Sequence, residues 1–372
     1  MKRGNFSARL CGLTVLVATA TILSFSCSKK DPTGSDPKVD PPKDTALTRV
    51  GALSFSGFNR VPGLILVEYP FAYVACTNGS FMVIDVSDTL DLHVVDSFPV
   101  VGDSLYSGAY GGSPITKSGS LLCYVAYDVR HSAPCRAQIF SVSPQGEITY
   151  KSSILRSVYD PVGHIYNCWS FGNATLSGNL LYLDGDVYDV SSPSSPQSLG
   201  HLDAYYSLGY QLPFSQSPVV IYENYAVFTG VYMQHPRLWV CDRTTRQIAG
   251  TLDLPDTIGY ARLSIVSGAA YLYSFGHPYV AEISLAEAAH PVFSHIYNIN
   301  ELTTDGMLWF SDTRIGRSRY NSAHSLDVGL AICDLNFNRV KANDTLEVYA
   351  CAITPTFTYV INSTGLTIFR TP

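Results

Sequence analysis

The sequence has few charged residues and very few methionines. Charged residues make up 15% of its 372 positions, and 4 Met stand against 25 Tyr. No helical periodicity persists for three turns, which excludes an all-helical fold. A hydrophobic content of 46% excludes wholesale disorder and is enough for a sizeable core. The abundant tyrosine favours strands, so we expect an all-β protein.

Basic charge is scarce as well. The formal net charge is −6, and removing an N-terminal leader with Lys2, Arg3 and Arg9 would take it to about −9. A surface of that charge is a poor match for phosphate-rich partners. We therefore expect neither nucleic acid nor anionic lipid as a partner.

The linear motifs of common enzymes are missing. The sequence has no G-x-S-x-G, no H-E-x-x-H, no phosphate-binding loop and no dinucleotide glycine fingerprint. It also lacks C-x-x-C, and the segment "DGDVYD" (184–189) is explained better by a hairpin turn than by a calcium loop. We predict no metal site, no cofactor and no catalytic residue. A glycan-acting envelope hydrolase stays open as the alternative, because separate loops can still bring catalytic groups together.

The N-terminus is typical of an export signal. A basic start and the apolar run Leu10–Phe25 precede a small residue, Ser26, and then Cys27. This order resembles the lipobox of bacterial lipoproteins, which implies a diacylated Cys27, although an ordinary signal peptide remains the alternative. We predict a signal peptide at 1–26 and, from its Pro, Lys and Asp content, a disordered tether at 27–45.

Seven cysteines would remain after Cys11 and Cys27 are set aside, so at least one would be unpaired. We expect most of them to be small buried hydrophobes in strands. The pair Cys123 and Cys135 flanks one expected hairpin loop and is the disulfide candidate.

One hairpin pattern recurs along residues 46–372. "YVACTNGSFMVIDVSD" (73–88) is an aromatic strand, a turn, a second strand and Asp-Val-Ser, and "LLYLDGDVYDVSS" (180–192) repeats that order. The residues that end the second strand of each hairpin are spaced by 36 to 56 positions, as in blades of four short strands. They are Asp85, Ser141, Asp189, Asp242, Glu282, Asp334 and Arg370. A short polar side chain there can accept from backbone N–H groups and start the next turn.

These repeats predict a β-propeller of seven four-stranded blades. The last unit ends after its third strand, and Leu47–Gly57 is a lone strand ahead of the first unit. Pairing the two would close the ring and remove an exposed edge. A two-sheet sandwich is the alternative, but sandwich strands seldom repeat one hairpin at a regular period.

The repeats "AYVACTNGSFMVIDVSD" and "LLYLDGDVYDVSSPSSP" resemble the LVIVD repeat of exported bacterial lipoproteins. The match is good in the first and third units, partial in the fourth and sixth, and poor in the rest. The resemblance implies a β-propeller in the cell envelope. It implies no activity and no site residue.

In a propeller, the loops between second and third strands share one face with the connections between blades. The long segments of this sequence fall on that face, including 128–136, 230–237 and 311–327. Aromatic rings beside donors suit a glycan or the centre of a protein interface. The candidate ligand-binding residues are Tyr159, His164, Trp169, Tyr205, Tyr206, Tyr210, His235, Arg237, His277, Arg314, Arg317, Tyr320 and His324.

Taken together, the sequence predicts a monomeric binding or scaffold module in the cell envelope. Its membrane contact would be the N-terminal lipid, and its partner a glycan or an envelope protein. Periplasmic and surface display remain open.

Overall fold

The computed structural model describes residues 46–372, apart from 57–61, 77–79, 99–114, 127–134, 157–173, 184, 204–218, 233–234, 259–260, 275–278, 300–306 and 322–325. The chain divides into two units, Met1–Lys43 and Asp44–Pro372, and all described residues belong to the second. Among them, no helix has the length and apolarity needed to cross a membrane.

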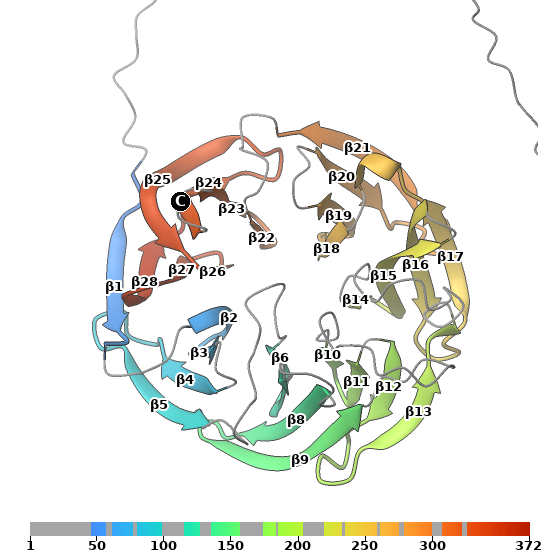
Figure 1. Cartoon of the computed structure of the whole chain (residues 1–372), viewed down its shortest axis with the longest axis horizontal. Helices are drawn as coiled ribbons and strands as arrows, with labels where there is room; N and C mark the ends of the chain where they lie inside the picture. Colours follow the sequence, from blue (N-terminus) through green and yellow to red (C-terminus); the bar gives the residue numbers. More distant parts are fainter. Residues whose placement is uncertain are drawn as a thin grey trace, which may run out of the picture. The chain divides into compact units, whose positions relative to one another are not determined.

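Seven four-stranded antiparallel sheets form the blades of a β-propeller, as the sequence predicted (Figure 1). Blade 1 comprises β2 (Pro62–Glu68), β3 (Phe71–Cys76), β4 (Phe81–Asp85) and β5 (His93–Phe98). Blade 2 comprises β6 (Ile115–Ser118), β7 (Leu121–Ala126), β8 (Cys135–Val142) and β9 (Ile148–Arg156). Blade 3 comprises β10 (Ala174–Ser177), β11 (Leu180–Leu183), β12 (Asp186–Asp189) and β13 (Gln197–His201).

Blade 4 comprises β14 (Val220–Tyr222), β15 (Tyr225–Tyr232), β16 (His235–Asp242) and β17 (Ile248–Asp253), followed by the short 3-10 helix η1 (Asp256–Ile258). Blade 5 comprises β18 (Ala261–Val266), β19 (Ala269–Ser274), β20 (Tyr279–Ser284) and β21 (Val292–Asn298). Blade 6 comprises β22 (Leu308–Phe310), β23 (Ile315–Asn321), β24 (Leu326–Cys333) and β25 (Arg339–Val348). Blade 7 comprises β26 (Ala350–Ile353), β27 (Phe357–Asn362), β28 (Gly365–Arg370) and β1 (Arg49–Ser54).

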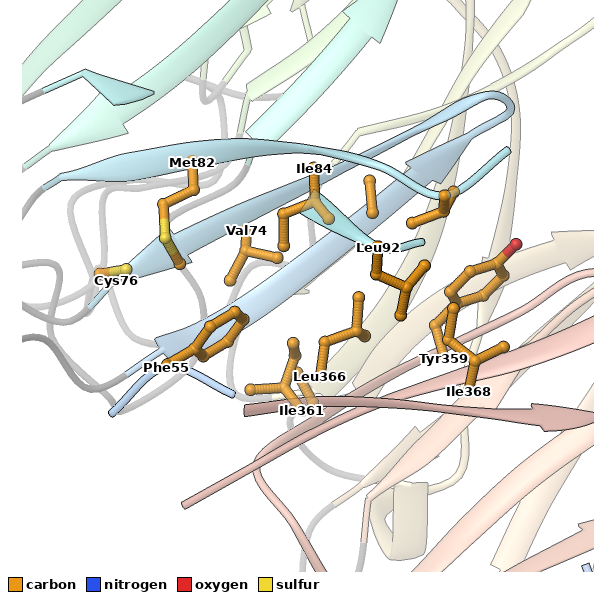
Figure 2. Close-up of a cluster of buried hydrophobic side chains, with 13 residues drawn as sticks. Phe55, Val74, Cys76, Met82, Ile84, Leu92, Tyr359, Ile361, Leu366 and Ile368 are labelled. Carbon is orange, nitrogen blue, oxygen red and sulfur yellow. The ribbon is translucent and has the colours of Figure 1, made fainter. Parts of the chain in front are cut away.

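The ring closes between the two ends of this unit, as predicted. β1 pairs antiparallel with β28 and supplies the outermost strand of blade 7 (Figure 1). Side chains from both ends share one apolar cluster between blades 7 and 1 (Figure 2). Phe55, which follows β1, is buried there against strands β3, β4 and β28. Because apolar burial is the main favourable term in folding, this cluster stabilises the closure.

The aspartates at the ends of the third strands hold turns, as their position in the repeat suggested. Asp85 accepts a hydrogen bond from the Ser87 N–H at 2.8 Å, and Asp242 accepts from the N–H groups of Thr244 and Thr245. Asp189 and Asp334 do the same in their blades. In blades 2 and 5 the expectation for Ser141 and Glu282 is wrong. Ser143 and Ser284, two residues further on, are the acceptors.

A regularity that the sequence did not reveal lies in the outer strands. In every blade the pairing of the third strand with the outer strand skips one residue, which is a β-bulge. The skipped residues are Val50, Val95, Lys151, Leu199, Ala249, Ser294 and Val340. Bulges bend and twist an edge strand, so they discourage pairing with another chain.

The cysteines agree with our expectation of buried residues but not with the predicted disulfide. Cys76, Cys123, Cys241, Cys333 and Cys351 are buried free thiols, in agreement with a packing role. The proposed disulfide is wrong, because Cys123 lies opposite Ile139 in the hairpin and is unbonded. Burial raises the pKa of its thiol to about 12, which suppresses the reactive thiolate.

Candidate functional site

The two faces of the propeller differ in the length of their connections. We call the face with the β-turns after the first and third strands of each blade the short-turn face, and the opposite one the long-loop face. On the short-turn face, β2 and β3 are joined by two residues, Tyr69 and Pro70. On the long-loop face, β9 ends at Arg156 and β10 begins at Ala174. Long loops on a rigid scaffold are where binding residues concentrate.

On the long-loop face, polar side chains of the described residues gather in blade 4, where β16 begins and β17 ends. His235 and Arg237 begin β16, Asp253 ends β17, and Asp256 begins η1. We call these four residues the blade 4 cluster. Residues two apart on a strand share a face, so His235 and Arg237 are presented together.

One ion pair and one hydrogen bond organise the blade 4 cluster. Nε of Arg237 donates to Oδ1 of Asp253 at 2.5 Å, across the register pair that joins β16 to β17. Nδ1 of His235 lies 3.4 Å from Oδ1 of Asp256, and these side chains are 69% and 78% exposed. Exposed pairs of this kind are screened by water and contribute little to stability. Their polar atoms are therefore suited to exchange partners with a ligand.

Arg237 is more constrained than His235. Its side chain is only 24% exposed, and its guanidinium lies 5.3 Å from the ring of buried Trp239. A cation over an indole face is attracted by the ring quadrupole, and the plane of the guanidinium is thereby fixed. The arrangement presents an oriented donor group beside an aromatic surface.

The backbone beneath the cluster is anchored in the core. Leu254, just before η1, and Ile258, its last residue, are buried in the cluster between blades 4 and 5. The Leu254 N–H also donates to the Pro236 carbonyl at 2.8 Å. These contacts tie η1 to β16, so Asp256 is held at a defined place opposite His235.

Two of the predicted long loops are largely strand. In 230–237, only residues 233–234 separate β15 from β16, and in 311–327, β23 occupies Ile315–Asn321. Arg314 precedes β23 in the turn from β22 and so lies on the short-turn face, opposite to His235. Its guanidinium donates to the main-chain oxygen of Pro372 at 2.7 and 3.0 Å. Arg314 therefore links blade 6 to blade 7.

Two further candidates are placed by β23. Arg317 is half-buried in the strand. Burial raises the pKa of the Cys333 thiol, and the charge of Arg317 opposes that shift. Tyr320 lies near the upper end of β23, opposite Asp327. Neither residue belongs to the blade 4 cluster.

The other candidates lie outside the described residues. They are Tyr159, His164, Trp169, Tyr205, Tyr206, Tyr210, His277 and His324, together with the lipidation candidate Cys27. Their roles stay predictions. In the described part of the chain, no three His, Cys, Asp or Glu side chains come together in a way that could hold a metal ion.

Sequence reasoning named His235 and Arg237 as candidates but did not predict the two carboxylates that they contact. Asp253 faces Arg237 only because β17 carries a bulge at Ala249, which shifts the register by one residue. Asp256 reaches His235 through the fold of η1. The run "DLPD" (253–256) shows two closely spaced carboxylates, but the sequence does not indicate which residues they contact.

Comparison with known proteins supports the fold alone. No family model matches the chain, and no curated protein sequence matches it significantly. The structure is similar to the β-propeller domain of Cps50 (Swd1) from Myceliophteria thermophila, with a TM-score of 0.60, 12% identity, and 88% of this chain and 100% of that chain covered. It is also similar to the hydrazine synthase of Kuenenia stuttgartiensis (TM-score 0.53, 10% identity, 83% of this chain and 95% of that chain covered).

A third similar structure is the computationally designed protein Ika8, with a TM-score of 0.50, 11% identity, and 87% and 100% coverage of the two chains. At such identities the likeness reports architecture and no activity. The resemblance to the LVIVD repeat stays a prediction. The chain has the fold of a seven-bladed β-propeller.

Proposed function

We propose that this protein is a binding or scaffold module of the bacterial cell envelope. In this proposal a lipid on Cys27 anchors the chain, and the long-loop face meets a glycan or a protein. The observation that carries the proposal is the asymmetry of the two faces. Short hydrogen-bonded turns occupy one face, while the long connections that follow blades 1, 2 and 3 and the polar side chains of the blade 4 cluster occupy the other.

The chemistry of the blade 4 cluster favours a ligand rich in hydroxyl or carboxylate groups. Arg237 offers an oriented planar donor, and Asp256 and His235 offer exposed acceptors and donors. Glycans and polar protein surfaces both present such groups, and both bind well where aromatic and polar side chains alternate. We expect the candidate residues Tyr205, Tyr206 and Tyr210 to extend this surface.

A glycan array tests the proposal. Purified protein would be applied as wild type, as the double variant His235→Ala/Arg237→Ala, and as the variant Tyr205→Ala/Tyr206→Ala/Trp169→Ala. We expect a bound glycan whose affinity falls at least about tenfold in either variant. The control is Asp312→Ala, an exposed change on the short-turn face that should leave binding intact. Binding that survives both loop-face variants would contradict the proposal.

The same assay can separate binding from catalysis and from protein recognition. Release of reducing sugar from a bound glycan would favour the hydrolase alternative. If no glycan binds, cross-linking in the envelope with the same variants tests for a protein partner. Protease treatment of intact cells then distinguishes surface display from a protected periplasmic domain.

A further inference from the structure

The chain enters the propeller on the short-turn face. β1 runs antiparallel to β28, so its first residue, Arg49, lies opposite Phe369 near the end of β28. That end adjoins the turn between β26 and β27, where the Thr371 N–H donates to the Thr356 carbonyl. The Arg370 N–H donates to the Thr48 carbonyl at 2.9 Å and fixes the entry point there.

The two most exposed large apolar side chains of the described residues lie on this same face, in blade 1, whereas the chain ahead of β1 runs beside blade 6, where Ala46 bridges to Ala342 of β25. Leu90 is 88% exposed and Tyr69 is 67% exposed, and both lie on short-turn-face turns of blade 1. The turn that carries Leu90 touches β1 directly, because a Cβ on Gly51 would collide with the Thr89 carbonyl. Exposed apolar side chains scattered singly are ordinary, but here the two extremes share one blade and one face.

The turn beneath Leu90 is built to hold the side chain outward. Oδ1 of Asp88 accepts from the Leu90 N–H at 2.8 Å, and the Asp91 N–H donates to the Asp88 carbonyl at 3.1 Å. With the backbone fixed by these bonds, the turn places Leu92 in the core and leaves Leu90 exposed. Its exposure is therefore a property of the folded turn.

We infer that the short-turn face of blade 1 rests on the surface of the bilayer that carries the N-terminal anchor, with Leu90 and Tyr69 at the lipid interface. The inference rests on the lipid anchor of the proposed function. Leucine and tyrosine are side chains that partition to the membrane interface. The exposed carboxylates of Glu68, Asp88 and Asp91 border them, which favours uncharged headgroups over anionic ones.

The length of the expected tether makes a weak contact sufficient. Residues 28–45 have the composition of a linker, whose span is roughly 25 to 55 Å between its flexible and extended limits. A surface site held within that distance of the bilayer meets it at an effective concentration in the millimolar range. The long-loop face would then point away from the membrane, toward its ligand.

The test uses the full acylated chain on phosphatidylcholine vesicles that contain bromine-labelled lipid, which quenches tryptophan fluorescence on contact. The reporters are Leu90→Trp and Tyr69→Trp on the short-turn face, with His235→Trp as the matched reporter on the long-loop face. Wild-type protein supplies the background emission of the native tryptophans. We expect the emission added at positions 90 and 69 to be quenched and shifted to shorter wavelength, and that at 235 to be unchanged.

Quenching at position 235, or vesicle-bound protein with no quenching at 90 and 69, would overturn the inference. Mass spectrometry of Cys27, with Cys27→Ser as its control, separates this failure from that of the proposed function. An unacylated chain that does not float with vesicles would overturn both proposals. Replacing part of the phosphatidylcholine with phosphatidylglycerol should reduce the quenching, and a gain instead would contradict the charge argument.

Discussion

At the scale of single residues, the aspartate at the end of the third strand is the feature that recurs most consistently among the blades. Asp242 accepts from two backbone N–H groups and from the Thr245 hydroxyl, and its second oxygen accepts from the Asn224 amide. A carboxylate used in this way accepts hydrogen bonds from backbone N–H groups of the turn that have no carbonyl partner in the sheet. The residue thus decides where the third strand ends.

Removing that carboxylate should destabilise blade 4. For Asp242→Ala we expect the free energy of unfolding to fall by about 1 kcal/mol, since charge-assisted bonds are lost at a solvated site. Asp242→Asn keeps one acceptor oxygen and should lose less. Urea denaturation measures both, and Asp312→Ala, in a turn of blade 6, serves as the control. Equal losses for the alanine and asparagine variants would argue against the acceptor role.

The same aspartates predict an acid-sensitive fold. Hydrogen bonds from Ser87, Ser191 and Thr245 hold the pKa of Asp85, Asp189 and Asp242 below the ordinary value of 3.8. A lowered folded-state pKa adds stability above the unfolded value, and that stability is lost as pH falls through the folded value. Wild-type protein should therefore lose more stability between pH 5 and about pH 3 than Asp242→Asn does. Urea midpoints at the two pH values provide the measurement, and a larger loss in the variant would refute the linkage.

At the scale of elements, the bulged outer strands explain how blades hold their neighbours. In blades 7, 1, 2 and 4, the residue after the bulge meets the next blade near the turn before the outer strand of that blade. Asp96 accepts from the Ile148 N–H at 2.8 Å, and the Ser152 hydroxyl donates to the Pro193 carbonyl at 2.5 Å. Glycine occupies the position in Gly51 and Gly250, where the neighbouring backbone is too close for a Cβ. One device thus joins blades of different sequence.

Gly250→Ala should test this contact. The added methyl would collide with the backbone of Ala289 in blade 5, and backbone atoms cannot move aside cheaply. We expect a loss of about 1 to 3 kcal/mol, in line with overpacking elsewhere. At Gly119 an added Cβ has no neighbour within 4 Å, but φ is +57°, so Gly119→Ala should cost only about 1 kcal/mol. Thermal or urea unfolding of the two variants distinguishes them, and equal losses would contradict the steric argument.

At the scale of the whole molecule, the ring depends on strands from opposite ends of the described chain. Truncating Phe55 to alanine removes a buried ring from the cluster between blades 7 and 1 (Figure 2). We expect a loss of about 3 to 5 kcal/mol and faster tryptic cleavage at Arg49 in β1. Phe228→Ala, buried between blades 3 and 4, should destabilise the protein similarly without favouring that cut. Cleavage at Arg49 that is equally fast in both variants would show that closure is not local to Phe55.

Much of the ring could be predicted because each blade has a recognisable pattern within its own stretch of sequence. Strand alternation, the Asp-Val-Ser turn and the lone strand before Tyr73 are sequence-local signals, and they predicted seven blades and the closure by β1. The candidate site was less predictable. Arg314 and His235 were assigned to one face, but a strand lies where a loop was expected, and the two residues are on opposite faces. The sequence pattern does not show where a loop ends and the following strand begins.

The sequence by itself determined the blades, since period-two alternation and turn residues act over a few positions along the chain. Only the tertiary structure decided which side chains meet across blades and turns. The pairing of Arg237 with Asp253 depends on a bulge, and the contact of Arg314 with Pro372 depends on the packing of blade 6 against blade 7. It also placed the turn that carries Leu90 against β1. These are contacts between residues far apart in the chain, and their geometry arises only when the whole ring is packed.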